Sequence, residues 1–174
     1  MLIRALDPAD VQPYRELMLE AYALAPDAFT TTAEEPAGEP ESWWVKRIGH
    51  PQGTQVVFGA EAGAELVGTV ALEFAVKPKT RHNALLIGMY VRQHARGEGV
   101  GRLLLDEALR LASGRPGVQA VTLTVTENNE HAIRLYEGAG FTAWGTQPMA
   151  IATPSGLKSK VHMLRALATS SVAP

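Results

Sequence analysis

The alternation of hydrophobic and polar positions changes period several times along the chain, and each change predicts a new element. Short apolar runs rich in β-branched residues and bounded by glycine, proline or polar clusters are typical of strands. Residues 55–60 and 65–76 are two such runs separated by a short turn, and they predict a hairpin. Strands are predicted at residues 2–6, 55–60, 65–76, 84–91, 120–125, 141–145 and 161–166.

Apolar residues three and four positions apart predict helices between these strands. Tyr14, Leu17 and Met18 share one face of a helix that Asp10 is expected to cap. Polar stretches with prolines predict loops. Helices are predicted after Asp10, at residues 42–48, at 100–113, and from 128 or 129 to a glycine cap at 140; loops are predicted at 30–41 and 146–160.

This order of elements predicts an α/β fold with a mixed central sheet of about seven strands and four flanking helices. The strand–helix–strand unit at 84–125 is expected to be a right-handed parallel crossover, and the earlier hairpin makes the sheet mixed. A chain of 174 residues suits one domain with a sizeable core. We place that domain at residues 1–167, followed by a flexible tail at 168–174.

Composition argues against several classes of function, among them nucleic-acid binding and cysteine-based catalysis. The net charge of −2, without a long basic run, argues against nucleic acid as the main partner. The absence of cysteine excludes disulfides, thiolate metal sites and a cysteine nucleophile. The sequence shows no signal-peptide pattern and no apolar run long enough to span a bilayer. We therefore expect a cytoplasmic protein without a membrane partner.

Three glycines at alternate positions, Gly97, Gly99 and Gly101, join the apolar run 84–91 to the helix that follows. Glycines let the backbone approach a ligand closely and adopt positive φ. The start of a helix presents unpaired N–H groups and the positive end of its dipole, which together favour a phosphate. Arg96 and Arg102 flank the turn and add positive charge.

Two common phosphate motifs do not fit this turn. A Walker A loop requires lysine and then serine or threonine after its last glycine, whereas Gly101 is followed by Arg102. The dinucleotide fingerprint G-x-G-x-x-G has two residues in its second gap, and this chain has one. The pattern from Arg96 through Gly99 to Gly101 resembles instead the pyrophosphate loop of the GNAT N-acetyltransferases. A glycine-rich turn without a ligand is the simpler alternative.

A second block resembles the other GNAT signature. It follows the strand at 120–125 and reads Asn129-x-x-Ala132-x-x-Leu135-Tyr136-x-x-x-Gly140-Phe141. The two blocks occur in the order that the family shows. The resemblance covers about residues 2–167 and implies the GNAT fold and an N-acetyltransferase domain at 1–167. It also implies acetyl-CoA as cosubstrate, and a homodimer is left open because family members often dimerise.

The resemblance implies cofactor contacts at three places: the strand end, the glycine turn and the second signature helix. Backbone groups of residues 89–91 are expected to bond the pantetheine arm and to polarise the thioester carbonyl. Asn129 is explained equally well as a helix cap. The implied set is Met89, Tyr90, Val91, Arg96, Gly97, Glu98, Gly99, Val100, Gly101, Arg102, Asn129 and Tyr136.

Tyr136 occupies the position of the family tyrosine, which implies a general acid or a group that positions the thiol. A tyrosine packed on the core is the alternative, because Tyr136 belongs to an apolar helix face. Many family members carry a glutamate base on the strand before the glycine turn, but residues 84–91 contain no acid. Glu73 and His82 are candidate bases, and either could simply be solvated. A water chain or no dedicated base is also open.

Acceptor sites in this family imply residues 25–44 and the loop at 146–160. The substrate candidates are Phe29, Glu34, Glu35 and Trp44. The glutamates could attract a cationic amine, or they could form a solvated acidic loop. One of the adjacent tryptophans, Trp43 and Trp44, is expected in the core and the other in the wall of the site. The histidines lack metal-binding spacing, so we expect no metal.

These features predict an enzyme that moves an acetyl group from acetyl-CoA to a primary amine, of a small molecule or a protein, in a ternary complex. The missing strand glutamate keeps an alternative open, a domain of the same fold that binds acyl-CoA without turnover. A different acyl chain or a hydroxyl acceptor is a further alternative. A phosphate-binding domain unrelated to CoA would require the second block to be a coincidence.

Overall fold

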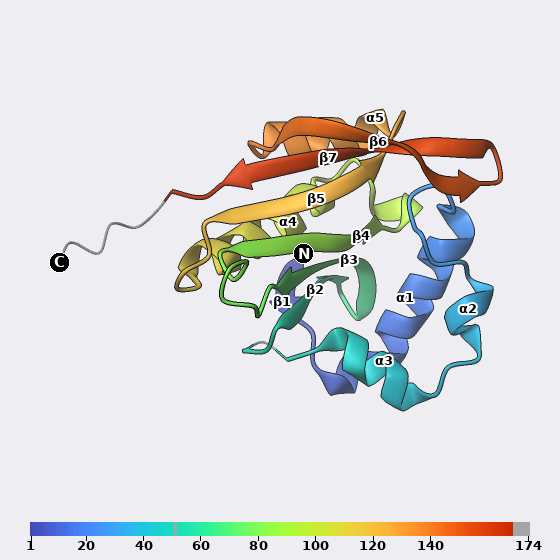
Figure 1. The fold of residues 1–174 in the computed structure, drawn as a ribbon. Helices are drawn as coiled ribbons and strands as arrows, with labels where there is room; N and C mark the ends of the chain where they lie inside the picture. Colours follow the sequence, from blue (N-terminus) through green and yellow to red (C-terminus); the bar gives the residue numbers. More distant parts are fainter. Residues whose placement is uncertain (51, 169–174) are drawn as a thin grey trace.

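Seven strands form one sheet in the order β1-β2-β3-β4-β5-β7-β6 (Figure 1). The computed structural model describes residues 1–50 and 52–168. Neighbouring strands are antiparallel except β4 and β5, which are parallel. The predicted mixed α/β sheet is confirmed. The strands are β1 (Leu2–Ala5), β2 (Gln55–Ala62), β3 (Glu65–Phe74), β4 (Asn83–Val91), β5 (Ala120–Thr126), β6 (Thr142–Thr153) and β7 (Gly156–Ala166).

Within residues 1–50 and 52–168, five α-helices cover the sheet, one more than predicted. They are α1 (Val11–Leu24), α2 (Glu34–Ala37), α3 (Glu41–Ile48), α4 (Val100–Gly114) and α5 (Glu130–Gly138), with 3-10 turns η1 (Pro8–Asp10) and η2 (Gln93–Ala95). The unexpected helix, α2, interrupts the predicted loop 30–41. At its start, Glu35 Oε2 accepts from Thr32 N at 2.7 Å, and Glu35 N donates to Thr32 Oγ1 at 3.4 Å. This Thr-x-x-Glu capping box is visible in the sequence, so the helix was predictable.

Asp10 is the N-cap residue of α1, as predicted, but its side chain makes no bond to the first turn of the helix. Its carboxylate accepts instead from Asp7 N at 2.9 Å and pairs with Arg4 at 2.7 Å. Asp7 caps the preceding turn η1 by accepting from Ala9 N at 2.8 Å. The chain therefore starts its first helical region one turn earlier than the hydrophobic pattern indicates.

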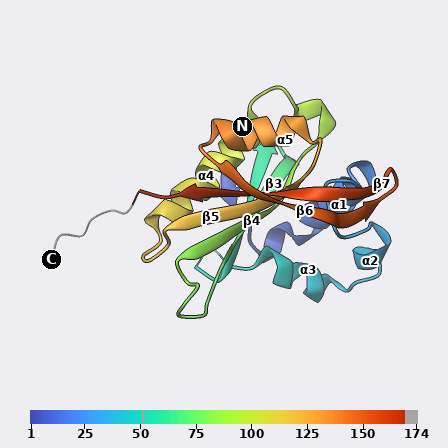
Figure 2. The same cartoon turned by 45° about the horizontal axis from the view of Figure 1, so that its top comes forward.

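The two faces of the sheet bury two separate cores. Successive residues of β2 alternate between them: Val56 and Phe58 pack with α4 and α5, and Val57 packs with α1 and α3. This alternation follows from the two-residue period of a strand. Figure 2 shows α4 and α5 on one side of the sheet and α2 and α3 on the other. The sheet is thus a central layer between two layers of helices.

The long hairpin β6–β7 replaces the predicted loop at 146–160. The two strands pair from Thr142 with Leu164 to Thr153 with Gly156, with register irregularities between Gln147 and Ile151. Pro148 lies in that irregular region, and β6 is the edge strand of the sheet, where proline is tolerated. The predicted loop is therefore wrong because its proline signal marks an irregular edge strand. The predicted tail lies outside the described residues, apart from Ala168.

The strands β4 and β5 pair only at their first residues and then separate. Their register covers Asn83 with Ala120 to Leu85 with Thr122. Beyond this point β4 has an extra residue relative to β3, where Thr69 and Ala71 face Tyr90 and Ile87. Gly88 lies in this bulge with φ of 65°, and a bulge bends its strand. The edge of β4 that faces β5 is consequently unpaired along residues 89–91.

Candidate active site

The glycine turn before α4 has the geometry of an anion site. Gly97 and Gly99 have φ of 83° and 79°, a region that favours glycine. Gly99 is the N-cap of α4 and has no side chain to satisfy the N–H groups of the first turn. A Cβ on Gly101 would lie 3.3 Å from Leu135 Cδ2. Gly101 therefore lets α4 pack closely against α5, and the other two glycines shape the turn.

A groove of about 1380 Å³ runs along this turn and is lined by both signature blocks. It passes the unpaired end of β4, the start of α4 and the first turns of α5. Ten of the predicted cofactor residues line it: Met89, Tyr90, Val91, Arg96, Gly97, Gly99, Val100, Gly101, Arg102 and Asn129. Glu98 is exposed and is not among the lining residues. A long ligand with an anionic centre fits this combination of a free strand edge and a helix N-terminus.

The two arginines beside the turn are held differently. Arg96 donates from Nε to Val91 O at 2.9 Å, and its guanidinium lies 5.7 Å from the centre of the Tyr90 ring. Within the described residues, Arg96 has no carboxylate partner. Arg102 is paired with Asp106 at 2.8 Å and donates to Gly138 O at 3.0 Å. Arg96 is thus the arginine whose charge is available to an anion in the groove.

Asn129 lies where the groove meets a second, smaller cavity, and it lines both. Its Oδ1 accepts from Ala132 N at 3.2 Å, which makes it the cap of α5. Its Nδ2 makes no hydrogen bond within the described part of the chain. The cap and a contact to a ligand therefore use different atoms of one amide, so both predicted roles are compatible.

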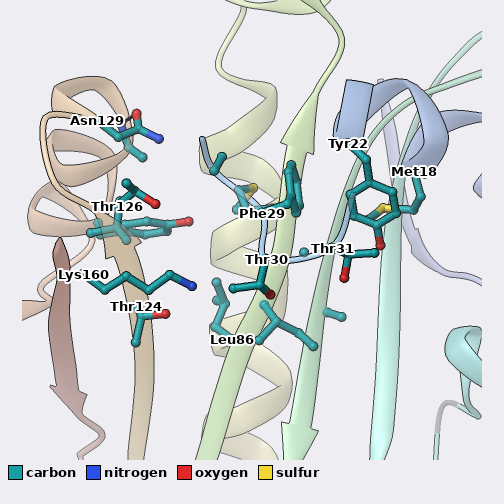
Figure 3. A pocket seen from close by; sticks show the side chains of 18 of the residues that line it. Met18, Tyr22, Phe29, Thr30, Thr31, Leu86, Thr124, Thr126, Asn129 and Lys160 are labelled. Atoms are coloured by element: carbon teal, nitrogen blue, oxygen red, sulfur yellow. Dashed lines mark hydrogen bonds between the residues drawn. The ribbon is translucent and has the colours of Figure 1, made fainter. Parts of the chain in front are cut away.

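The smaller cavity, of about 250 Å³, occupies the opening between β4 and β5. Its walls come from both helix layers, with Met18 and Tyr22 of α1 on one side and Ala132 of α5 on the other. Figure 3 shows Lys160 and Thr126 on the wall opposite Tyr22. The groove and the cavity share Ala28, Phe29, Met89, Thr126, Asn129 and Ala132. A ligand in the groove and a second one in the cavity would therefore meet at this junction.

The loop that carries Phe29 is tied across the opening. Thr126 Oγ1 donates to Asp27 O at 2.6 Å, and Lys158 pairs with the Asp27 carboxylate at 3.0 Å. The bond from Lys158 lowers the pKa of Asp27. The Phe29 ring lies against Tyr22, with 5.2 Å between ring centres. Phe29 is the one predicted substrate residue that the structure brings to the cavity.

Tyr136 lies in the smaller cavity, one helical turn beyond Ala132. Its side chain is only 6% exposed, and its ring packs edge-on against Phe141 at 5.9 Å. Burial raises the pKa of Tyr136 to about 12, because the charged phenolate is disfavoured away from water. The phenol is therefore neutral at ordinary pH and can donate a proton. The Tyr136 side chain thus packs on the core and also lines the cavity.

Comparison with known proteins decides the family. The profile of the Acetyltransferase (GNAT) family matches residues 16–141. The chain belongs to the GNAT acetyltransferase family. Most residues that line the groove and the cavity lie within the matched range; those outside it are Tyr14, Pro154, Ser155, Lys158 and Lys160.

Relatives of this GNAT chain are distant but cover most of its length. YwnH of Bacillus subtilis (strain 168), named as a candidate phosphinothricin acetyltransferase, is 25% identical over 133 residues, which are 76% of this chain and 80% of YwnH. The L-amino acid N-acetyltransferase AaaT of Escherichia coli (strain K12) is 24% identical over 146 residues, 84% of this chain and 85% of AaaT. The structure of yncA from Salmonella typhimurium, solved with its cofactor acetyl-CoA, has a TM-score of 0.78 at 22% identity, covering 100% of this chain and 97% of yncA.

One substrate residue predicted for this GNAT site is corrected by the structure. Trp44 is fully buried between Tyr14 and Trp43, with ring centres 6.3 and 5.0 Å away, so it belongs to the core and cannot touch an acceptor. Helical spacing alone did not tell which of the two tryptophans faces inward. Trp43 does not line the cavity either.

The predicted acids also lie away from the cavity. Glu34 and Glu35 are exposed on α2, and Glu73 is exposed near the end of β3; none of them lines the groove or the cavity. β4 carries no acid, and no aspartate or glutamate is among the described residues that line the cavity. A carboxylate base is thus not supplied by the cavity wall.

Two functional candidates were not singled out from the sequence, although Lys160 ends the predicted acceptor range 146–160. Arg47 of α3 and Lys160 of β7 both line the smaller cavity. Lys160 pairs in register with Thr126 at the junction with the groove, and burial lowers its pKa. Lys160 lies at the boundary between the predicted loop at 146–160 and the predicted strand at 161–166. Extending the alternating pattern of β7 back to Lys160 could have shown which face of the sheet its side chain is on.

No described helix has the length and apolar character needed to cross a membrane. Across residues 1–50 and 52–168, no three histidine or acidic side chains gather into a possible metal site.

Proposed function

We propose that this GNAT protein transfers an acetyl group from acetyl-CoA to a primary amine by direct attack in a ternary complex. The observation that carries the proposal is the junction of the groove and the cavity at Met89 and Asn129. Acetyl-CoA would lie in the groove, with its pyrophosphate at the glycine turn and its thioester at the junction. The amine would reach the thioester from the cavity, so both substrates are held at once.

The residues at the junction fit the chemistry of acyl transfer. The amine nitrogen forms a bond to the thioester carbonyl carbon, and the carbon–sulfur bond breaks. Backbone N–H groups of residues 89–91 that point to the edge of β4 without a β5 partner would stabilise negative charge on the carbonyl oxygen. Tyr136 would give its proton to the departing thiolate and recover one from the amine, so that the products are an amide and a free thiol.

The names of the relatives support a small acceptor. AaaT is named as an L-amino acid N-acetyltransferase, and YwnH is named after phosphinothricin. The cavity of about 250 Å³ lies just below the usual size range of pockets for drug-sized ligands. A small primary amine therefore fits the cavity better than an extended protein segment.

The acid-free cavity favours one alternative, a domain that binds acyl-CoA without turnover. The two functions are separated by incubating the protein with acetyl-CoA and a library of primary amines, and measuring release of free thiol. We expect thiol release with a subset of amines, and a mass increase of one acetyl group on each of these amines. Acetyl-CoA binding without any acetylated amine would support the alternative and contradict the proposal.

A further inference from the structure

The smaller cavity has an uneven charge. Its lining contains two cations, Arg47 and Lys160, and no carboxylate among the residues that the structure describes. The protein as a whole has a net charge of −2. The positive character of the cavity is therefore local, and it comes from two side chains on different elements.

The charge of Arg47 is not compensated within the described residues. Its Nη2 donates to Tyr22 Oη at 3.3 Å, and its guanidinium lies 4.8 Å from the centre of the Trp43 ring. Its Nε is buried without a hydrogen-bond partner. Arginine stays protonated at all physiological pH values. Arg47 is half-buried, and a partly desolvated charge without a counter-ion is unfavourable, so an anion brought by the ligand would be bound favourably here.

Lys160 supplies the second charge from the opposite wall. It comes from β7, and Figure 3 shows it directed toward the space in front of Tyr22. Its neighbour on the same strand, Lys158, is paired with Asp27 at 3.0 Å, whereas Lys160 has no ion pair within the described chain. The two free cations thus face one space from β7 and from α3.

This charge distribution discriminates between classes of amine. A simple alkylammonium ion brings a third positive charge into the cavity, and no acid is there to attract it. An amine that also carries an anion brings no net charge and gives Arg47 a partner. The same positive surroundings favour the neutral, nucleophilic form of the bound amine. That effect lowers the need for the carboxylate base that β4 lacks.

We propose that the acceptor is a small amine that carries an anionic group, such as a carboxylate, and that Arg47 binds this group with Lys160 adding a second attraction. This inference rests on the proposed function and names the substrate class of its site. It replaces the hypothesis that Glu34 and Glu35 attract a cationic amine. A phosphonate offers the same negative oxygens as a carboxylate, so both are tested.

The test compares acceptors that differ only in the anion. Initial rates of thiol release are measured with apolar L-amino acids, their carboxamides, the matching 1-aminoalkylphosphonates and simple alkylamines. We expect kcat/KM to be higher for the anionic members, with Arg47→Gln lowering the acid-to-amide ratio by about 10–100-fold. Lys160→Gln is expected to lower the ratio less. The phosphonate arm shows which anion the cavity prefers.

The ratio is measured within each protein sample, so partial loss of folded protein in a variant cancels. Arg81→Gln is the matched control, because Arg81 is exposed and lines neither space, and its ratio should equal that of the wild type. Amides or alkylamines used as well as acids, with a ratio unchanged in Arg47→Gln, would overturn this inference and leave the acetyltransferase intact. No thiol release with any acceptor would overturn both.

Discussion

At the scale of single residues, α5 and its cap supply two side chains to the site, one at the junction of groove and cavity and one in the cavity. Asn129 caps the helix with Oδ1 and presents Nδ2 at the junction of groove and cavity. Tyr136, two turns further along, reaches the cavity with its ring held by Phe141. Because both residues sit on one short rigid helix, their separation is fixed by helix geometry. Such placement suits a group that must meet a thiolate at a defined point.

Replacing Tyr136 with phenylalanine removes the phenol and keeps the ring that packs on Phe141. We expect kcat to fall by about 10²–10⁴-fold, because the departing thiolate loses its acid. Acetyl-CoA affinity should be nearly kept, because Tyr136 does not line the groove. Steady-state kinetics with calorimetric titration measures both quantities. Wild-type turnover in Tyr136→Phe would remove Tyr136 from the mechanism.

The same tyrosine predicts a pH profile. Burial raises the pKa of Tyr136 to about 12, so the phenol keeps its proton well above neutral pH. Ionisation of this acid should therefore cause no loss of wild-type kcat up to about pH 10, where a solvated tyrosine is already half ionised. A fall in kcat at lower alkaline pH that vanishes in Tyr136→Phe would contradict this assignment.

The residues of the groove were predictable because they belong to two local sequence patterns. Most of those of the acceptor cavity were not, apart from Phe29 and the signature residues, because α1, α3, β5 and β7 meet there only in the folded chain. Arg47 shows the difference. Its helix was expected, but only the folded chain places its guanidinium beside the neutral side chains of Tyr22 on α1 and Trp43 on its own helix. Glu34 and Glu35 were reasonable candidates by charge, but α2 holds them away from the cavity.

At the scale of elements, the site depends on the separation of β4 from β5. The bulge at Gly88 bends β4 after three paired positions, and the opening that results contains the cavity and frees the backbone of residues 89–91. The strand itself was predicted from its apolar run. Its bulge was not, because Gly88 also fits an ordinary strand pattern in which glycine has several causes.

Gly88→Ala tests the bulge. No atom lies within 4 Å of a Cβ built there, so the substitution acts through φ of 65° and not through a clash. We expect a loss of about 1–2 kcal/mol in the free energy of unfolding, measured by urea denaturation. Gly114→Ala near the end of α4 is the matched control, because it also has open space but no positive φ, and it should be neutral or stabilising. Equal stability of both variants would argue against strain at the bulge.

At the scale of the whole molecule, the sheet separates two cores and is open at one place. The core under α4 and α5 supports the groove, and the core under α1 and α3 supports the far wall of the cavity. The opening between β4 and β5 connects these two sides. The overall arrangement therefore provides two sites that meet, one for a long anionic donor and one for a small acceptor.

The most direct test of this account is calorimetric titration with acetyl-CoA, comparing wild type with Gly99→Glu. A carboxylate at the N-terminus of α4 would repel a pyrophosphate and fill the turn, so we expect micromolar binding to weaken by at least about 100-fold. Gly99→Ala separates backbone strain at φ of 79° from charge, and Gly114→Glu controls for the added glutamate. Undiminished binding in Gly99→Glu, or no binding by folded wild type, would contradict the assignment of the groove to acetyl-CoA.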